Sequence, residues 1–476
     1  MIQVRDLRFT YSTSDKPSLD VKSLDIDEGA TVLCGLTGSG KTTLLRCING
    51  LIPHYYGGKM GGSVLVDGLD TKHIEPGDIA SSVGTVFQDP ENQFLMLTVR
   101  EELAFGPRNS GLNEEQIQQR ISIVAERLGI AHLISRNIFE LSSGEKQKLA
   151  IAAILATEPR YMLFDEPTSQ LDDASSETLL SLLCDLARER SLLITEHRIE
   201  RTKNFPFRYI GIENGTLLAD GNYANIRQWF LRKNIDIEAA GTPYHRGRKG
   251  ALMLDARDIT AGYGNRRILE DVSVQLFEGE IVMLAGRNGS GKTTLLKSIL
   301  NFIPGREGKV FFDGKEITNE ISANIAKYIA YLSHNPLNYL FHSTLREEME
   351  FTASNVMDGK PPAHHVDDIA NDLGIGKKLD QFPREFSCGE RETAAIASVL
   401  AGGRRCMLLD EPTRGLDYSR KHQFMEMLRS LSDNGYCVLM ATHDYPLIMR
   451  YADRVYMLEH GKCTEFEPEK VRRELT

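Results

Sequence analysis

The chain has 476 residues, of which 41% are hydrophobic and 26% charged, and its formal net charge is −10. This balance is typical of a globular protein with two to four domains, and because no long Lys/Arg run occurs we expect no nucleic-acid partner. No apolar run reaches the roughly 18–20 residues of a membrane-spanning helix, and seven cysteines without CxxC spacing indicate a reducing compartment rather than a metal or disulfide framework.

The chain opens with a strand-like segment and then a glycine-rich stretch. Residues 2–9 alternate apolar and polar side chains, which predicts a strand. An apolar run at 31–34 and a helix-like run at 44–48 flank a GxxxxGK[ST] motif, and this context indicates a P-loop whose backbone N–H groups cradle phosphate. We expect Lys41 to reach the β- and γ-phosphates of ATP and the Thr42 hydroxyl to ligate Mg²⁺. The expected nucleotide-binding residues here are Gly35, Gly38, Ser39, Gly40, Lys41, Thr42 and Thr43.

A helix and two buried strands follow in the first half of the chain. Residues 113–128 are rich in Glu, Gln and aliphatic side chains between two glycines and predict a helix. The continuous apolar runs at 161–164 and 192–194 predict buried parallel strands. The first ends in Asp165 and Glu166, and we expect Asp165 to hold the Mg²⁺ shell and Glu166 to polarise the attacking water as a general base. The alternative is a pair of solvated turn carboxylates.

The same series of features returns in the second half. Gly286 lies 251 positions after Gly35, and Glu411 lies 245 positions after Glu166. The chain is therefore a tandem duplication, which we divide into domains 1–231 and 251–476 joined by a surface linker at 232–250. The second P-loop supplies Gly286, Gly289, Ser290, Gly291, Lys292, Thr293 and Thr294. We expect Thr293 of this P-loop and Asp410 of the second acidic pair to bind Mg²⁺, and Glu411 to act as the general base.

Two further segments point to a family. Leu141-Ser142-Ser143-Gly144-Glu145 and, more loosely, Phe386-Ser387-Cys388-Gly389-Glu390 resemble the signature motif of ATP-binding-cassette (ABC) ATPases. The motifs occur in that family's order in both halves. The resemblance implies an α/β fold with two P-loop NTPase cassettes arranged head to tail, each with a RecA-like parallel-sheet core, an antiparallel β subdomain and a helical subdomain.

The resemblance also implies shared nucleotide sites. In the family each ATP is held between the P-loop of one cassette and the signature of the other. Lys41 would then share a nucleotide with Ser387 and Gly389, and Lys292 would share one with Ser142 and Gly144, so that one chain forms an internal pseudo-dimer. The alternative is that the signature segments are only capped helix starts.

Other roles are carried over from the family residue by residue. Tyr11 and Tyr263 resemble the aromatic residue that stacks on adenine, although a strand-end aromatic residue is equally often core packing. Gln88 resembles the Q-loop glutamine that touches Mg²⁺ or the attacking water. His197 and His443 match the switch histidine that contacts the γ-phosphate.

The two halves depart from the family pattern in different ways. The D-loop is matched by 169–172 and 414–417, but both signatures end in glutamate, Glu145 and Glu390, where the family often has glutamine. His334 stands at the Q-loop position of the second half. We therefore expect unequal sites, with slower hydrolysis or different coupling at the Lys292 site.

One branch of the family is the most similar. Residues 86–94 and 98–107 resemble the ATPases of energy-coupling-factor transporters, which import cobalt, nickel and vitamins. The resemblance implies ATP-driven import of a micronutrient at the cytoplasmic face of the membrane. The partners would be an integral-membrane coupling protein and a substrate-binding membrane protein. Gln93 and the apolar run 94–97 would receive a short helix of the coupling protein, unless that run is core.

Two other functions stay open. The chain is also similar to soluble tandem-cassette ATPases that act on ribosomes or DNA, although the expected linker is short and contains glycine. An exporter ATPase is a weaker alternative, because those proteins are usually fused to a membrane domain.

Overall fold

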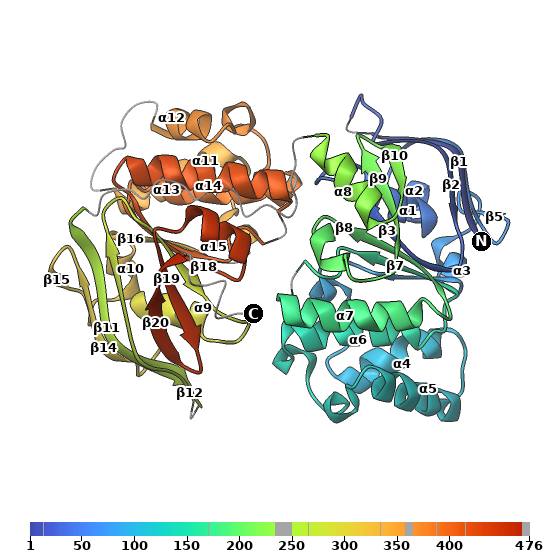
Figure 1. The fold of residues 1–476 in the computed structure, drawn as a ribbon, viewed down its shortest axis with the longest axis horizontal. Coiled ribbons are helices and arrows are strands. Elements are labelled where there is room, and N and C mark those ends of the chain that lie inside the picture. The colour runs from blue at the N-terminus through green and yellow to red at the C-terminus, as the bar shows by residue number, and fades with distance from the viewer. Residues whose placement is uncertain are drawn as a thin grey trace. The chain divides into compact units, whose positions relative to one another are not determined.

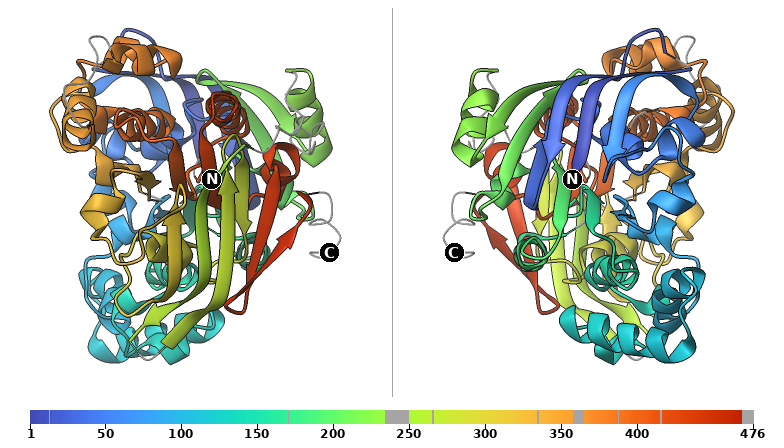
Figure 2. Two further views of the ribbon diagram at one scale, coloured as in Figure 1. Left: turned by 90° about the vertical axis from the view of Figure 1, so that its left-hand side faces the viewer. Right: turned by 90° about the vertical axis from the view of Figure 1, so that its right-hand side faces the viewer.

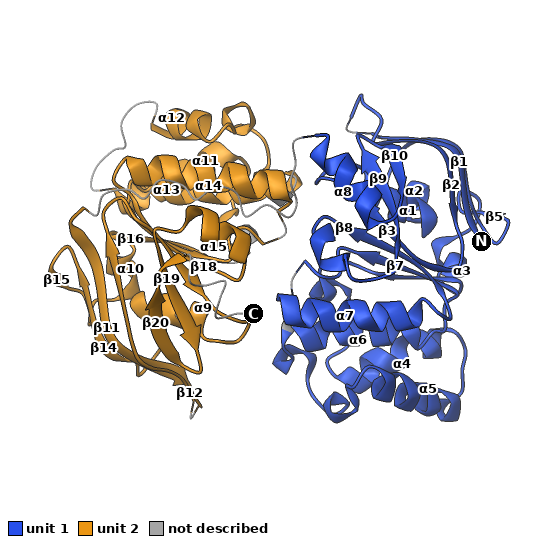
Figure 3. Ribbon diagram, in the orientation of Figure 1, with its two compact units in different colours: residues 1–238 blue, residues 239–476 orange. Residues whose placement is uncertain are grey.

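The computed structural model describes residues 1–12, 14–169, 171–233, 250–264, 266–333, 335–357, 365–386, 388–414 and 416–468. The chain divides into two compact units, Met1–Glu238 and Ala239–Thr476 (Figure 3). The predicted linker at 232–250 lies almost entirely outside the described residues.

Unit 1 begins with an antiparallel sheet in the strand order β2-β1-β4-β5 (Figures 1 and 2, blue strands). Its strands are β1 (Ile2–Tyr11), β2 (Leu19–Ile26), β4 (Gly58–Val66) and β5 (Leu69–Asp70). The predicted alternation in β1 is confirmed on either side of a bulge between Arg5 and Arg8. Asp6 in the bulge has a φ of 45°, and the extra residue shifts the buried positions from Ile2 and Val4 to Leu7 and Phe9.

The second sheet of unit 1 has the strand order β10-β9-β3-β8-β7-β6 and is parallel except for β10. Its strands are β3 (Gly29–Cys34), β6 (Val83–Val86), β7 (Tyr161–Asp165), β8 (Ser191–Glu196), β9 (Arg208–Glu213) and β10 (Thr216–Gly221). The apolar runs predicted as buried strands are β7 and β8, and every residue of both is buried.

Helices cover the parallel sheet and form a separate layer beside it (Figure 1). The α-helices of unit 1 are α1 (Lys41–Ile48), α2 (Leu51–His54), α3 (Pro76–Ile79), α4 (Val99–Asn109), α5 (Glu114–Arg127), α6 (Ser143–Leu155), α7 (Asp173–Leu186) and α8 (Tyr223–Leu231). Short 3₁₀ turns are η1 (Pro90–Gln93), η2 (Ala131–Leu133), η3 (Ile138–Glu140) and η4 (Ile199–Thr202). The predicted helix at 113–128 is α5, with Asn113 as its N-cap in a capping box.

Unit 2 repeats both sheets. Its antiparallel sheet, yellow-green in Figure 2, has the order β12-β11-β14-β15, and its six-stranded sheet has the order β16-β17-β18-β13-β19-β20. The strands are β11 (Leu252–Tyr263), β12 (Arg266–Phe277), β13 (Ile281–Ala285), β14 (Glu307–Phe312), β15 (Lys315–Glu316), β16 (Ile329–Leu332), β17 (Cys406–Asp410), β18 (Cys437–Thr442), β19 (Arg454–Glu459) and β20 (Lys462–Phe466).

The helices of unit 2 follow the same plan. They are α9 (Lys292–Ile299), α10 (Ser322–Ile325), α11 (Leu345–Val356), α12 (His365–Asp372), α13 (Cys388–Leu400), α14 (Tyr418–Asp433) and α15 (Tyr445–Tyr451). Its 3₁₀ turns are η5 (Pro336–Tyr339), η6 (Gly376–Lys378) and η7 (Pro383–Glu385). Two cassettes of this α/β type were predicted from the sequence, and the structure confirms the fold of each.

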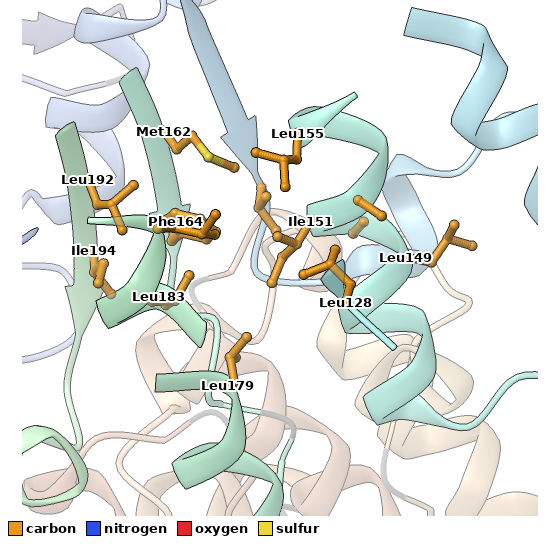
Figure 4. Packing of buried hydrophobic residues seen from close by; sticks show 14 of the residues in the cluster. Leu128, Leu149, Ile151, Leu155, Met162, Phe164, Leu179, Leu183, Leu192 and Ile194 are labelled. Atoms are coloured by element: carbon orange, nitrogen blue, oxygen red, sulfur yellow. The ribbon is translucent and has the colours of Figure 1, made fainter. Parts of the chain in front are cut away.

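The parallel sheet of unit 1 has an apolar core on each face. Leu163 belongs to the cluster formed with the antiparallel sheet and α1. Its neighbours Met162 and Phe164 belong to the cluster formed with α6 and α7. Figure 4 shows Phe164 and Ile151 in this second cluster with Leu183 of α7. Because both faces are covered, β7 and β8 are apolar through their middle on both faces and become polar only at their ends.

Leu183 tests how much the second cluster contributes to stability. Leu183→Ala leaves a cavity between α7 and the sheet, so we expect it to lower the free energy of unfolding of unit 1 by about 2–5 kcal/mol. The control Leu218→Ala removes a side chain that is 51% exposed on β10, and we expect a change of less than about 0.5 kcal/mol. Urea unfolding followed by the fluorescence of Trp229, the one tryptophan of the sequence, reports on unit 1. Equal effects of the two substitutions would contradict this account.

Candidate nucleotide-binding and catalytic site

The residues predicted to act on a nucleotide in unit 1 converge at one edge of the parallel sheet. The loop after β3 carries the P-loop, and the segment after β6 carries Gln88. Asp165 ends β7 and Glu166 follows it, while His197 follows β8. Since β3, β6, β7 and β8 are parallel, their carboxyl ends share this edge, where open α/β sheets bind ligands.

The P-loop of unit 1 has a backbone that only glycine tolerates at two positions. Gly40, the N-cap of α1, has a φ of 107°, and a Cβ there would lie 2.8 Å from the Ser18 carbonyl oxygen. A Cβ on Gly35 would lie 2.2 Å from the carbonyl oxygen of Ile212. The loop therefore closes tightly over the start of α1. Lys41 is buried at this start, and its Nζ donates to the carbonyl oxygens of Gly35 (2.8 Å) and Leu36 (3.1 Å).

Glu166 lies in the left-handed backbone region, with a φ of 47°. A non-glycine residue rarely adopts this conformation, and here the hydroxyl of Thr195 helps to hold it by accepting a hydrogen bond from the Glu166 backbone N–H at 2.9 Å. The same hydroxyl donates to Asp165 Oδ1 at 2.7 Å. Thr195 therefore orients both acidic residues, a role that the sequence analysis missed.

Cationic and polar side chains surround the Glu166 carboxylate. Its Oε1 lies 3.6 Å from Lys41 Nζ, and its Oε2 lies 3.2 Å from His197 Nδ1. Gln88 Nε2 donates to Oε2 at 2.9 Å. Burial alone would raise the pKa of Glu166, but His197 and Lys41 outweigh burial and lower this pKa to about 2. Glu166 is therefore ionised at neutral pH, as a general base must be.

The pKa of Asp165 is raised, whereas that of Glu166 is lowered. Burial raises its pKa and Glu166 adds to that rise, while hydrogen bonds from Thr195 and Thr42 oppose it. The Thr42 hydroxyl donates to Asp165 Oδ1 at 3.1 Å. Thr42 and Asp165, two of the three side chains predicted to touch Mg²⁺ in this half, thus lie together, while the third, Gln88, donates to Glu166 instead.

Unit 2 builds a second site with the same geometry. Lys292 Nζ donates to the Gly286 carbonyl oxygen at 2.8 Å and lies 3.5 Å from Glu411 Oε1. His443 Nδ1 lies 2.9 Å from Glu411 Oε2. Burial opposes it, but His443 and Lys292 lower the pKa of Glu411, which also has a left-handed backbone with a φ of 52°. The Thr293 hydroxyl donates to Asp410 Oδ2 at 2.8 Å.

The two sites differ beside their acidic pairs. Ala441 pairs with Asp410 across β17 and β18, where unit 1 has Thr195. Asp410 therefore has no counterpart of the Thr195 hydroxyl at that position. Burial, followed by the charge of Asp410, raises the pKa of the Tyr331 phenol. His334, predicted at the Q-loop position, lies outside the described residues.

The signature of unit 1 forms a helix cap. Ser142 is the N-cap of α6, and its hydroxyl accepts a hydrogen bond from the Glu145 backbone N–H at 3.4 Å. In return Glu145 Oε2 accepts from the Ser142 backbone N–H and from the Ser142 hydroxyl, each at 2.8 Å. Glu145 thus closes a capping box, and the hydrogen bond from the Ser142 backbone lowers its pKa. Gly144 lies in the first turn of α6 with open space at its Cβ position.

The signature of unit 2 is described only in part, because Ser387 lies outside the described residues. Gly389 lies at the start of α13, where a Cβ would come within 2.0 Å of Arg420 Nη1. A side chain at position 389 would therefore displace the Arg420 guanidinium.

The two strand-end tyrosines differ in their surroundings, whereas the D-loop aspartates of both units are helix caps. Tyr11 ends β1, packs edge-on against Phe9 and shares a hydrogen bond of 3.2 Å with the hydroxyl of Thr43. Tyr263 ends β11 and is exposed. Asp172 and Asp417 are the N-caps of α7 and α14, so these D-loop positions have a structural role. Gln170 and Gly415 lie outside the described residues.

The donors in each site suit a bound nucleotide with Mg²⁺. The Ser39 and Ser290 hydroxyls of the two P-loops are buried and have no hydrogen-bond partner among the described residues, as expected for groups that await phosphate oxygens. A single carboxylate with a threonine hydroxyl matches Mg²⁺, which takes most of its ligands from phosphate and water. The described residues contain no cluster of three His, Cys, Asp or Glu side chains that would hold a metal ion by itself.

Both halves of the chain match a known protein family. A family model described as ABC transporter matches residues 19–169 and 269–414, and each match contains one P-loop and one acidic pair. The chain is 34% identical to a protein of Saccharolobus solfataricus assigned as an ABC transporter ATP-binding protein, over 99% of this chain and 94% of that protein. A protein of Treponema denticola with the same assignment is 33% identical over 98% of this chain and 96% of its own.

Two solved structures are also similar to this chain. The structure of ribosome-bound archaeal Pelota and ABCE1 matches over 98% of this chain and 80% of the matched chain, with a TM-score of 0.68 and 19% identity, which is a likeness of fold. CbiO1 of Clostridium perfringens, part of the complex CbiONQ, matches over 49% of this chain and 91% of its own, with a TM-score of 0.44 and 28% identity. Among the residues that the structure describes, no helix is long and apolar enough to cross a membrane.

The lowered pKa of Glu166 predicts a pH dependence of stability. A folded-state pKa of about 2 lies below the ordinary value of about 4.5, so ionised Glu166 adds stability above pH 4.5 that is lost as the pH falls toward 2. Between pH 7 and pH 3 we expect the unfolding free energy of the wild type to fall more than that of Glu166→Gln. The expected difference is on the order of 2 kcal/mol.

The measurement is urea unfolding of unit 1 at pH 3, 4, 5 and 7, followed by Trp229 fluorescence. Glu115→Gln is the matched control, because Glu115 is an exposed glutamate of α5 in the same unit. The unfolding free energy of Glu115→Gln should change with pH in the same way as that of the wild type. Parallel pH profiles of the wild type and Glu166→Gln would show that Glu166 has an ordinary pKa.

Proposed function

Since the chain belongs to the ABC transporter family, whose ATP-binding proteins hydrolyse ATP, we propose that it is the ATP-hydrolysing subunit of a membrane transporter. More specifically, we propose an importer of the energy-coupling-factor type that takes up a vitamin or a transition-metal ion. The motifs at 86–94 and 98–107 support this branch. The chain would work at the cytoplasmic face of the membrane, bound to a coupling protein that carries a separate substrate-binding membrane protein.

Within each site the proposed roles follow from position and charge. Lys41 would bind the β- and γ-phosphates, and its ammonium lies 3.6 Å from Glu166 Oε1. Ionised Glu166 would accept a proton from the attacking water, while His197 stands against the same carboxylate. Mg²⁺ held by Thr42 and Asp165 would neutralise charge on the phosphates.

In unit 2 the corresponding roles would belong to four side chains of the second site. Lys292 would bind phosphate, Thr293 and Asp410 would hold Mg²⁺, and Glu411 beside His443 would act as the base. The pairing of each P-loop with the signature of the other unit, Ser142 with Gly144 or Ser387 with Gly389, stays a prediction from the family resemblance. The same holds for adenine stacking by Tyr11 and Tyr263.

The observation that carries the transport proposal is that, in unit 1, the segment which contacts the Glu166 carboxylate continues directly into an exposed apolar segment. Gln88, which bonds the catalytic carboxylate, lies a few residues before an apolar segment whose side chains Leu95 and Leu97 are 66% and 62% exposed. Phe94 and Met96 are partly buried, and Phe94 packs against the core. The alternation leaves two large apolar side chains in solvent beside the Q-loop, which suits the face of a partner helix.

Hydrolysis by the two sites tests their proposed roles and their inequality. Glu166→Gln and Glu411→Gln each remove one general base, and together they should lower ATP turnover by at least about 100-fold. We expect Glu166→Gln alone to cost more turnover than Glu411→Gln, because the Q-loop glutamine and Thr195 support only the first site. Steady-state phosphate release measures both variants, with Glu115→Gln as the control. Equal losses would remove the case for unequal sites.

Binding to membranes tests the transport role. The probe is inside-out vesicles from cells that make the protein, stripped of peripheral proteins with alkaline carbonate, with protein-free liposomes for comparison. The wild-type chain should sediment with the vesicles but not with the liposomes. Leu95→Asp with Leu97→Asp should weaken this binding, whereas Leu218→Asp, which changes an exposed leucine on β10, should not.

The same sedimentation experiment, with purified ribosomes added, distinguishes transport from the alternative function on ribosomes. A chain that ignores the vesicles but sediments with purified ribosomes would contradict the transport proposal and support a soluble tandem-cassette ATPase.

A further inference from the structure

Each unit has a buried carboxylate in the first turn of the helix that follows its exposed apolar segment. In unit 1 this residue is Glu102 of α4, which is 6% exposed, and in unit 2 it is Glu348 of α11, which is 3% exposed. The two residues lie 246 positions apart, the offset that also separates His197 from His443. A carboxylate is rarely buried so completely without hydrogen bonds to satisfy it.

The carboxylate of Glu102 holds a turn of the backbone. Its Oε2 accepts hydrogen bonds from the backbone N–H groups of Leu95 at 3.0 Å and Met96 at 2.9 Å. Hydrogen bonds to an ionised acceptor are about twice as strong as those between neutral groups, and the helix start favours negative charge. One oxygen therefore fixes two consecutive N–H groups of the segment that carries the exposed leucines.

Glu348 makes the same contact in unit 2. Its Oε2 accepts from the backbone N–H groups of Phe341 at 2.5 Å and His342 at 2.9 Å, and the His342 ring Nδ1 lies 3.2 Å from the same oxygen. Phe341 is 68% exposed, much as Leu95 is in unit 1. The side chains on the turn thus differ between the units, while the bond from carboxylate to backbone is the same. The shape of the backbone is the feature that both units share.

Packing alone does not account for this shape. The side chains of Leu95 and Phe341 project into solvent, so burial within their own units contributes little to the conformation of the turn. In unit 1, separate hydrogen bonds hold the two ends of the segment from Gln93 to Leu97. Gln93 Oε1 accepts from the Phe87 backbone N–H at 3.1 Å, and the Leu97 carbonyl oxygen accepts from Ile138 N–H at 3.0 Å.

Unit 2 ties the upstream end in an equivalent way with a different side chain. The Tyr339 hydroxyl accepts from the Ser333 backbone N–H at 2.9 Å, where unit 1 uses Gln93. Between these points, the backbone of each segment is hydrogen-bonded to the buried glutamate, Glu102 in unit 1 and Glu348 in unit 2.

We propose that Glu102 and Glu348 are positioning residues for partner docking. Each carboxylate holds the turn so that the apolar side chain at position 95 or 341 faces outward, toward an apolar helix face of the membrane partner. This inference rests on the proposed transport function and names the residues that give its docking surface a fixed shape.

Amide hydrogen exchange tests the local part of the inference. In the full chain, Glu102→Ala should speed exchange at Leu95 and Met96 by about tenfold or more, because both amides lose their hydrogen bond to a charged acceptor. Glu115→Ala, an exposed glutamate of α5, is the matched control and should leave exchange at both amides unchanged. Glu102→Gln keeps the size of the side chain and one acceptor oxygen, so exchange at the two amides should be faster than in the wild type and slower than in Glu102→Ala. This variant replaces Glu102→Ala in the test if the alanine variant fails to fold. Unchanged exchange at both amides in a folded variant would overturn the inference.

Vesicle binding tests the functional part. With the stripped inside-out vesicles as the probe, Glu102→Ala combined with Glu348→Ala should bind about tenfold more weakly than the wild type, and Glu115→Ala should bind like the wild type. If the wild type binds and the double variant binds equally well despite faster exchange, the positioning role is wrong and the transport proposal stands. If the wild type itself does not bind, the transport proposal fails and the docking role fails with it.

Discussion

The feature on which both units depend is a buried carboxylate held between two cationic or polar partners at the end of a parallel strand. Glu166 lies against Lys41 and His197, and Glu411 lies against Lys292 and His443. An isolated buried carboxylate would take up a proton, because burial disfavours its charged form. Its partners come from the ends of other strands, so the charge exists only while the parallel sheet keeps those ends together. The fold and the proposed chemistry therefore have the same requirement.

The duplication shows which parts of this arrangement can vary. Both units keep the lysine, the acidic pair, the histidine and the threonine hydroxyl on the first acid. The hydroxyl at the end of β8 is lost in β18, where Ala441 replaces Thr195. Loss of that hydroxyl removes a hydrogen bond from the acid that would hold Mg²⁺. The two sites are thus built alike but supported differently, which is the physical basis for expecting unequal turnover.

The connection from the site to the surface is short in unit 1. Gln88 touches the Glu166 carboxylate, Gln93 holds the backbone beside Gln88, and Glu102 holds the turn that presents Leu95. Each step is a hydrogen bond with a directional geometry, so a displacement of the exposed turn would reach the carboxylate through few intermediate atoms. A partner that binds this surface would therefore act on the group that we propose as the catalytic base.

The sequence by itself determined the two P-loops, the buried strands, the helix at 113–128 and the duplication. These features are local, because glycine conformation, apolar periodicity and cap residues act over a few neighbouring positions. Only the tertiary structure decided that Thr195 bonds both acidic residues and that Glu102 is buried against Leu95 and Met96. It also decided which side chains of 94–97 are exposed, a question that the pattern left open. Such contacts depend on which segments the fold brings together, and no short stretch of sequence contains both partners with their geometry.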